Sequence, residues 1–311
     1  MHPYIALLIG TAGIIFLLYL EAKDEGSSPA SLWVFTIWFF VIGSRPLMTW
    51  IYPSGDALTG NMEGTEGSMA NILFFLFCTL VAVIILFRRK VDVPLIIQSN
   101  IFLFLLLFYC GLSCFWSDFP LTSFRRWARM MFEVVVILAI VSDFYRLETL
   151  KRLLTRYAYI AIPLSIVLIK YFPHLGTQWN STGITKMWTG VEVHKNALGA
   201  ALGACLLYFF WKSFVLKDTN RKYWVLLLSL LSIYMLINPE GKGSSASIMA
   251  TLISLMFIVM ISLFKGRTRA IRVGLFVAIF LYFEISIGMS LFMGESLLEF
   301  VISLTGRDMT F

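Results

Sequence analysis

The stretch MANILFFLFCTLVAVIILF, residues 69–87, has no charged side chain and is followed directly by Arg88, Arg89 and Lys90. A membrane-spanning helix needs about 20 mostly apolar residues to cross ~30 Å of hydrocarbon. A basic cluster beside such a run is typical of a cytoplasmic loop. The stretch therefore predicts a membrane span whose carboxyl end faces the cytoplasm.

The same apolar pattern recurs along the chain. Hydrophobic residues make up 59% of the 311 residues and charged residues 14%, and the mean hydropathy is +0.83, outside the range of soluble globular domains. We expect an all-α polytopic membrane protein, a single integral membrane domain over residues 1–311, whose first span is retained because no signal-peptide cleavage pattern precedes Glu21. About ten spans are predicted, at 3–20, 31–51, 69–87, 94–114, 125–142, 157–172, 194–211, 223–238, 247–264 and 273–293.

The distribution of basic residues predicts that both termini lie on the outer side. With the 88–90 loop inside, most Lys and Arg residues fall in inner loops, as the positive-inside rule requires. This distribution, and not the pI near 9.2, is informative in a membrane protein, so nucleic-acid binding is not expected. The cations that remain on the outer side are Arg45, Arg125, Arg126, Arg129, Lys170, Lys186, Lys195, Lys242 and Arg307.

The four cysteines are interpreted as small apolar packing residues. They fall inside predicted spans and have neither metal-ligand spacing nor the loop positions of a disulfide framework. They are Cys78, Cys110, Cys114 and Cys205.

Several outer cations lie where a charge is costly. Arg45 is embedded in WFFVIGSRPLMTWI, and the adjacent Gly43 and Pro46 predict a kinked or locally opened helix. Arg125 and Arg129 share one helix face, and Glu133 lies one turn deeper, so an Arg129–Glu133 ion pair is one reading of that face.

The stretch GVEVHKNALGAALG, residues 190–203, combines two patterns. Gly199 and Gly203, four residues apart among alanines, predict a close helix-packing face. His194, Lys195 and Asn196 stand at the helix start, where they either cap the helix or contribute to a site.

Guanidinium and ammonium groups gathered at the outer membrane surface suit phosphate or diphosphate, since Arg forms paired charge-assisted bonds and Lys supplies a point charge. The head group of a lipid-linked diphosphate lies at this level of the membrane. Snorkelling to ordinary anionic phospholipid would satisfy the same residues.

Four stretches, in order along the chain, resemble motifs of the O-antigen ligase and polymerase superfamily, especially its exopolysaccharide-production branch. GVEVHKNALG is similar to the HKNxLG signature, and TGRD (305–308) to TGRTxxW. The other two are GSRP with the following Trp50, and FWSDFPLTSFRR (115–126). The order and the span of nearly the whole chain make chance agreement a poor explanation.

The resemblance implies a multispan glycosyltransferase of the bacterial inner membrane that transfers a polyprenyl-diphosphate-linked glycan to a saccharide acceptor at the outer face, without nucleotide sugar, metal or other cofactor. Its partners would be that glycan, the acceptor, the bilayer and other polysaccharide-export membrane proteins. The implied catalytic residues are Arg125, His194 and Arg307, with Arg45, Arg126, Lys195, Asn196 and Lys242 binding substrate. The diphosphate would be stabilised electrostatically as it leaves, and His194 would orient the acceptor or act as a base. The exopolysaccharide character favours a polymerase over a ligase.

The chain also departs from the pattern of the family. Ser245, Ala246 and Ser247 stand where relatives carry Ser-Arg/Lys-Thr, and Lys242 is the nearest replacement cation. Relatives continue beyond the equivalent of Arg307 with an outer loop containing a His-Asn pair and with further helices, so we expect a C-terminally short or inactive member. A secondary transporter or flippase is the alternative from another class, because charges in spans and broken helices also mark substrate sites of transporters.

Overall fold

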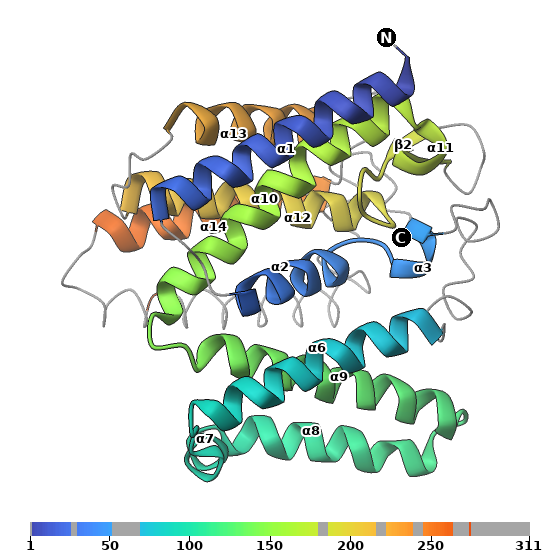
Figure 1. Ribbon diagram of the computed structural model, residues 1–311, viewed down its shortest axis with the longest axis vertical. Helices are drawn as coiled ribbons and strands as arrows, with labels where there is room; N and C mark the ends of the chain where they lie inside the picture. Colours follow the sequence, from blue (N-terminus) through green and yellow to red (C-terminus); the bar gives the residue numbers. More distant parts are fainter. Residues whose placement is uncertain are drawn as a thin grey trace, which may run out of the picture. The chain divides into compact units, whose positions relative to one another are not determined.

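The computed structural model describes residues 2–25, 30–51, 69–179, 186–215, 222–238, 245–263 and 274 (Figure 1). The chain divides into two units, Met1–Thr251 and Leu252–Phe311, and the second contributes only the end of α14 and residue 274 to the described ranges. In chain order the elements are α1 (Pro3–Glu25), α2 (Ala30–Ile42), α3 (Leu47–Ile51), α6 (Met69–Arg88), α7 (Val93–Ser99), α8 (Ile101–Ser113), η1 (Cys114–Trp116), α9 (Pro120–Val141), α10 (Arg146–Tyr171), α11 (Pro173–Gly176), β1 (Thr177–Trp179), β2 (Lys186–Trp188), α12 (Lys195–Phe210), η2 (Trp211–Val215), α13 (Lys222–Ile237) and α14 (Ser245–Leu263).

Four helical stretches in the described residues are long and apolar enough to cross a membrane: Pro3–Lys23, Met69–Arg88, Arg146–Tyr171 and Lys195–Phe214. α2, α8, α13 and α14 contain shorter apolar helices. Large apolar side chains such as Leu8 and Phe77 are exposed, as lipid-facing positions require. The protein is therefore an all-α, membrane-associated protein; the number of about ten spans and the sidedness of the termini remain predictions.

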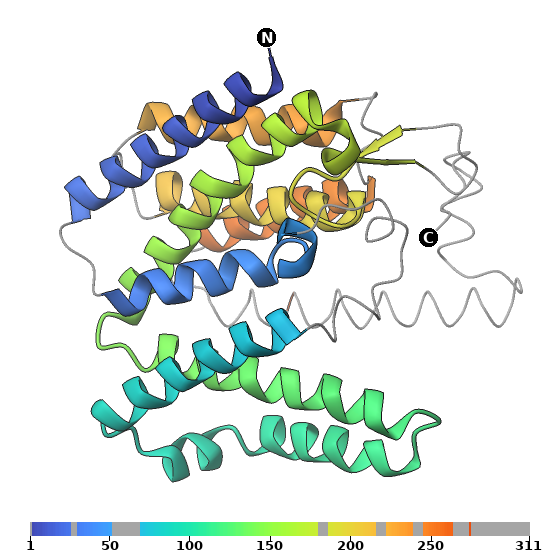
Figure 2. The same cartoon turned by 45° about the vertical axis from the view of Figure 1, so that its right-hand side comes forward.

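The core of the first unit is built around α10. This helix packs against α1, α2, α12 and α13, and Ala158 and Ala161 on it are almost fully buried, since small side chains let the neighbouring helices approach closely. A second apolar cluster joins α2, α6 and α9, with Ala82, Val136 and Ala139 inaccessible. Figures 1 and 2 show α6, α8 and α9 side by side and running in alternate directions, as the predicted topology requires of these segments.

The break predicted at Gly43 and Pro46 is confirmed, because α2 ends at Ile42 and α3 begins at Leu47. The span predicted over 94–114 is divided into α7 and α8. At the division, the Asn100 side chain donates to the Ile96 carbonyl at 3.0 Å, so a local side-chain bond competes with the regular helix. The tenth predicted span lies outside the described residues except for residue 274.

The predicted start of the span at residue 157 is wrong, since α10 begins at Arg146, eleven residues earlier. Helical propensity carries the helix through this polar segment. Arg156 is fully buried and forms an ion pair with Glu21 of α1, its Nε lying 3.0 Å from Oε2.

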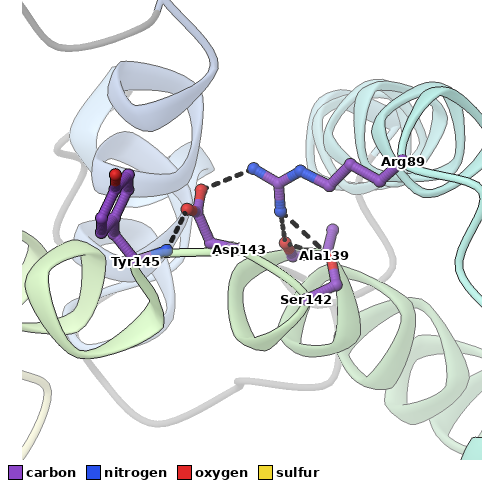
Figure 3. A network of polar contacts seen from close by, with 5 residues as sticks. All are labelled: Arg89, Ala139, Ser142, Asp143 and Tyr145. Carbon is purple, nitrogen blue, oxygen red and sulfur yellow. Dashed lines mark hydrogen bonds and ion pairs between the residues drawn. The ribbon is translucent and has the colours of Figure 1, made fainter.

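A polar network joins the end of α6 to the end of α9 (Figure 3). The Arg89 guanidinium donates to the Ala139 carbonyl at 2.8 Å and to Asp143 Oδ2 at 2.5 Å. The other Asp143 oxygen accepts from the Tyr145 N–H at 3.0 Å. Arg89 thus neutralises the negative end of the α9 dipole and fixes the turn into α10.

The four cysteines are free thiols, and all except the half-buried Cys110 are buried, in agreement with a packing role. The close-packing face predicted on α12 is also present at Gly203. A Cβ there would collide with Oγ1 of Thr251 on α14.

Gly203→Leu is therefore expected to destabilise the protein by about 1–3 kcal/mol through overpacking. The measurement is thermal unfolding of purified protein in detergent. Ala204→Leu, at the neighbouring exposed position, is the matched control and should unfold close to the wild-type temperature. Equal effects at the two positions would contradict close packing at Gly203.

Candidate functional site

The break between α2 and α3 is held against the loop that precedes α12. The Arg45 N–H donates to the Val191 carbonyl at 3.2 Å. The guanidinium donates to the carbonyls of Gly190 (2.6 Å), Glu192 (3.1 Å), Val191 (3.3 Å) and Leu175. Arg45 is only 3% exposed, so this cation is used to organise the loop and does not face solvent.

The loop can reach Arg45 because of its own local structure. β1 and β2 pair antiparallel, with Thr177 opposite Trp188, and Gly176 accepts hydrogen bonds from the N–H groups of Thr189 and Gly190. Gly190 has φ +58°, and a Cβ there would collide with Oγ of Ser165 on α10. Glycine at 190 therefore satisfies both the left-handed turn and the close approach to α10.

Glu192 is buried beneath this turn at 6% exposure. One carboxyl oxygen, Oε1, lies 3.1 Å from the Tyr157 Oη, and the same hydroxyl lies 2.7 Å from the Gly43 carbonyl oxygen. Burial raises the pKa of Glu192 to about 7, against the smaller opposing effects of the Tyr157 hydrogen bond and the Arg45 charge. Tyr157 thereby connects α10 to both sides of the junction, by which we mean the contact between the α2–α3 break (residues 43–46) and the loop before α12 (residues 189–194).

The start of α12 follows two residues later. His194 occupies the N-cap position, but its side chain makes no capping hydrogen bond, so the capping interpretation is not supported for the imidazole. His194 and Asn196 are exposed and Lys195 is half-buried. The Asn196 carbonyl accepts from Ser247 Oγ at 3.4 Å. The first turn of α12, a 16-residue helix, offers backbone N–H groups and the positive end of the helix dipole. Lys195 lies in the same turn, so this end of the helix favours binding of an anion.

Arg125 and Arg126 lie exposed in the second turn of α9. That helix packs on α6, α8 and α10. The Arg129–Glu133 ion pair expected from their spacing is confirmed at 3.2 Å. Lys242 and Arg307 fall outside the described residues.

Two participants in the junction were not identified from the sequence. Glu192 is noticeable in the sequence as an acidic residue two positions before His194 in an apolar stretch, but the sequence does not show which residue it contacts. Tyr157 is not noticeable, because an aromatic residue at the edge of a span is ordinary.

Comparison with models of protein families, with curated proteins and with solved structures found no match.

Proposed function

We propose that the protein is a glycosyltransferase of the bacterial inner membrane that polymerises or ligates an oligosaccharide carried on a polyprenyl diphosphate. One observation carries the proposal. GSRP and GVEVHKN, two of the four stretches that resemble the O-antigen ligase and polymerase superfamily, are about 146 residues apart in sequence and yet are joined by Arg45. Residues that serve one reaction are expected to meet in this way.

In the proposed reaction an acceptor hydroxyl attacks the anomeric carbon of the lipid-linked sugar. The bond between that carbon and the diphosphate oxygen breaks, and the polyprenyl diphosphate leaves with the bonding electron pair. The hydroxyl proton passes to a base, for which the exposed His194 is the candidate. No covalent intermediate on the protein is needed.

The cations have different parts in this proposal. Lys195 and the N–H groups at the start of α12 would receive the diphosphate, with Arg125, Arg126, Lys242 and Arg307 supplying further charge as it leaves. Asn196 would hydrogen-bond substrate from its exposed side chain. Arg45 is buried, and its Nε and Nη2 donate to backbone carbonyls, so it serves as a positioning residue for the 190–196 loop.

The resemblance to the exopolysaccharide branch favours a polymerase over a ligase. The bilayer supplies the lipid-linked donor, and membrane proteins that flip the donor or export the product would act before and after this step.

The test is polymer formation in cells whose own copy of the gene is deleted and replaced by variants. Arg125→Ala is expected to reduce polymer by about a hundredfold, the size of effect known for loss of one group that stabilises developing charge, and to accumulate the lipid-linked repeat unit. Lys222→Ala, an exposed cation at the start of α13, is the control and should leave polymer unchanged. Normal polymer from cells that lack the gene altogether would refute the proposed function.

A transporter or flippase is the second candidate, favoured by the buried Glu21–Arg156 pair and by the broken α2–α3 segment. Purified protein in liposomes separates the two. Polymerisation of a lipid-linked oligosaccharide without its movement across the bilayer supports the transferase, whereas movement without polymerisation supports the transporter.

A further inference from the structure

If Glu192 is ionised, the Tyr157 hydroxyl has one hydrogen for two oxygen atoms that can only accept. The Tyr157 hydroxyl carries a single hydrogen, and its oxygen lies 2.7 Å from the Gly43 carbonyl oxygen and 3.1 Å from Glu192 Oε1. A carbonyl oxygen and a carboxylate oxygen only accept. When the Tyr157 hydrogen points to Gly43, the shorter of the two contacts, the Glu192 contact is a full hydrogen bond of its own only with Glu192 protonated and donating to Tyr157.

We propose that Glu192 is a proton-bearing positioning residue: its neutral carboxyl, through Tyr157, ties the loop before α12 to the α2–α3 break and keeps the anion site at the start of α12 positive. This proposal rests on the proposed function, since it assigns to that site a diphosphate-bearing substrate. The burial of Glu192, and the pKa near 7 that results from it, agree with a carboxyl that holds its proton under near-neutral conditions.

Protonation of Glu192 changes the net charge near the start of α12, and other charged and titratable groups surround this carboxyl. Arg45 faces it from the α2–α3 break, Tyr157 from α10 and Cys205 from α12. With Glu192 neutral, the buried Arg45 charge is not cancelled, and it adds to the field of Lys195 and of the α12 N-terminus. Ionisation of Glu192 would place a negative charge two residues before His194, where it opposes a bound anion, and would cost the junction one of the two Tyr157 hydrogen bonds.

The expected pH dependence follows from these two states. Below pH 7 Glu192 is mostly protonated, and the site binds the diphosphate donor well. As the pH rises above about 7 the carboxyl ionises, so the KM for the lipid-linked donor is expected to rise severalfold with a smaller change in kcat.

The first test reads the proton directly and does not depend on activity. Purified full-length protein in lipid nanodiscs is titrated while the infrared absorption of protonated carboxyl groups is recorded. We expect a protonated-carboxyl band that is lost near pH 7 in the wild-type protein and is missing in Glu192→Gln. A carboxyl at 192 that is already ionised at pH 5 would overturn the proposal. If Glu192→Gln does not fold, labelling of the glutamate carboxyl carbons with a heavy isotope assigns the band to a glutamate, and Tyr157→Phe, which removes the hydroxyl beside Glu192, should shift its frequency.

The second test compares pH profiles of polymer formation by the wild-type protein, Glu192→Gln and Glu192→Ala. The amide of Gln donates to Tyr157 as a neutral carboxyl does, so Glu192→Gln is expected to lose the rise in KM above pH 7. Glu192→Ala lacks that donor and should be impaired at every pH. Glu148→Gln, at an exposed carboxylate on α10, should keep the wild-type profile.

The two tests fail separately. If Glu192→Gln keeps the wild-type rise in KM, the positioning role of the proton is refuted while the proposed function stands. If the wild-type protein forms no polymer at any pH, the proposed function fails, and the infrared titration still decides whether Glu192 holds the proton.

Discussion

Replacing Arg45 by methionine is expected to lower the free energy of unfolding by about 3 kcal/mol or more and to abolish polymer formation. Nε and Nη2 of the guanidinium, which carry three hydrogens, lie within hydrogen-bond distance of four backbone carbonyls in a buried setting. Hydrogen bonds to a charged group contribute about 1.5–3 kcal/mol each, and buried carbonyls left without donors add a desolvation cost. Methionine fills the volume but supplies no donor.

Lysine at this position would restore only part of the loss. The planar guanidinium directs several N–H groups at carbonyls on one side of the loop, whereas an ammonium group is a compact point charge with three donors. Arg45→Lys is therefore expected to be intermediate in thermal stability and to produce some polymer. The order wild type, Lys, Met in both measurements would identify donor geometry, and not charge alone, as the property that matters.

Thermal unfolding in detergent measures the stability, and limited proteolysis between residues 176 and 195 reports whether the loop has been released. Arg125→Met is the matched control, since Arg125 is exposed. It should unfold like the wild type but lose polymer formation if Arg125 contacts the diphosphate. A stable, protease-resistant Arg45→Met protein would show that the Arg45 contacts do not hold the loop.

The sequence predicted the helical class and the α2–α3 break because these depend on local patterns. Twenty apolar residues form a helix in lipid irrespective of their neighbours, and the effects of Gly43 and Pro46 on a helix are local. The same holds for the Arg129–Glu133 pair, which one helical turn brings together.

The candidate site could be predicted only in part because it is assembled from distant segments. Arg45 was recognised as a costly charge, but a diphosphate was its expected partner, whereas the structure gives it the carbonyls of residues 175 and 190–192. Backbone carbonyls have no sequence signature, so no residue pattern could reveal this. Arg156 illustrates the same limit, since its partner Glu21 lies 135 residues away.

The second large effect is expected at that buried pair. The side chains of Arg156 and Glu21 are 0% and 2% exposed, and the guanidinium lies 4.2 Å from the centre of the Trp33 ring. Removing one member leaves the other charge buried without its counter-ion, which typically costs about 3–5 kcal/mol. Glu21→Met and Arg156→Met are each expected to be destabilised by that amount.

The double variant, Glu21→Met with Arg156→Met, should be more stable than either single variant, because replacing a whole buried pair by apolar groups is often neutral. A double-mutant cycle on thermal or denaturant unfolding measures the coupling. The Lys151–Glu148 pair on the same helix, with Glu148 43% exposed, is the control, and Glu148→Gln should cost less than about 1 kcal/mol. Single Glu21 or Arg156 variants as stable as Glu148→Gln would refute the assignment.

The double variant also separates the two functional candidates. A transferase whose site is at the start of α12 needs the pair only to hold α1 against α10, so a folded double variant should still form polymer. A transporter that uses charges buried among its helices would lose its activity together with the pair, even when the fold survives. Polymer from a stable double variant would therefore assign Glu21 and Arg156 to structure, and a stable but inactive one would place them in the functional path.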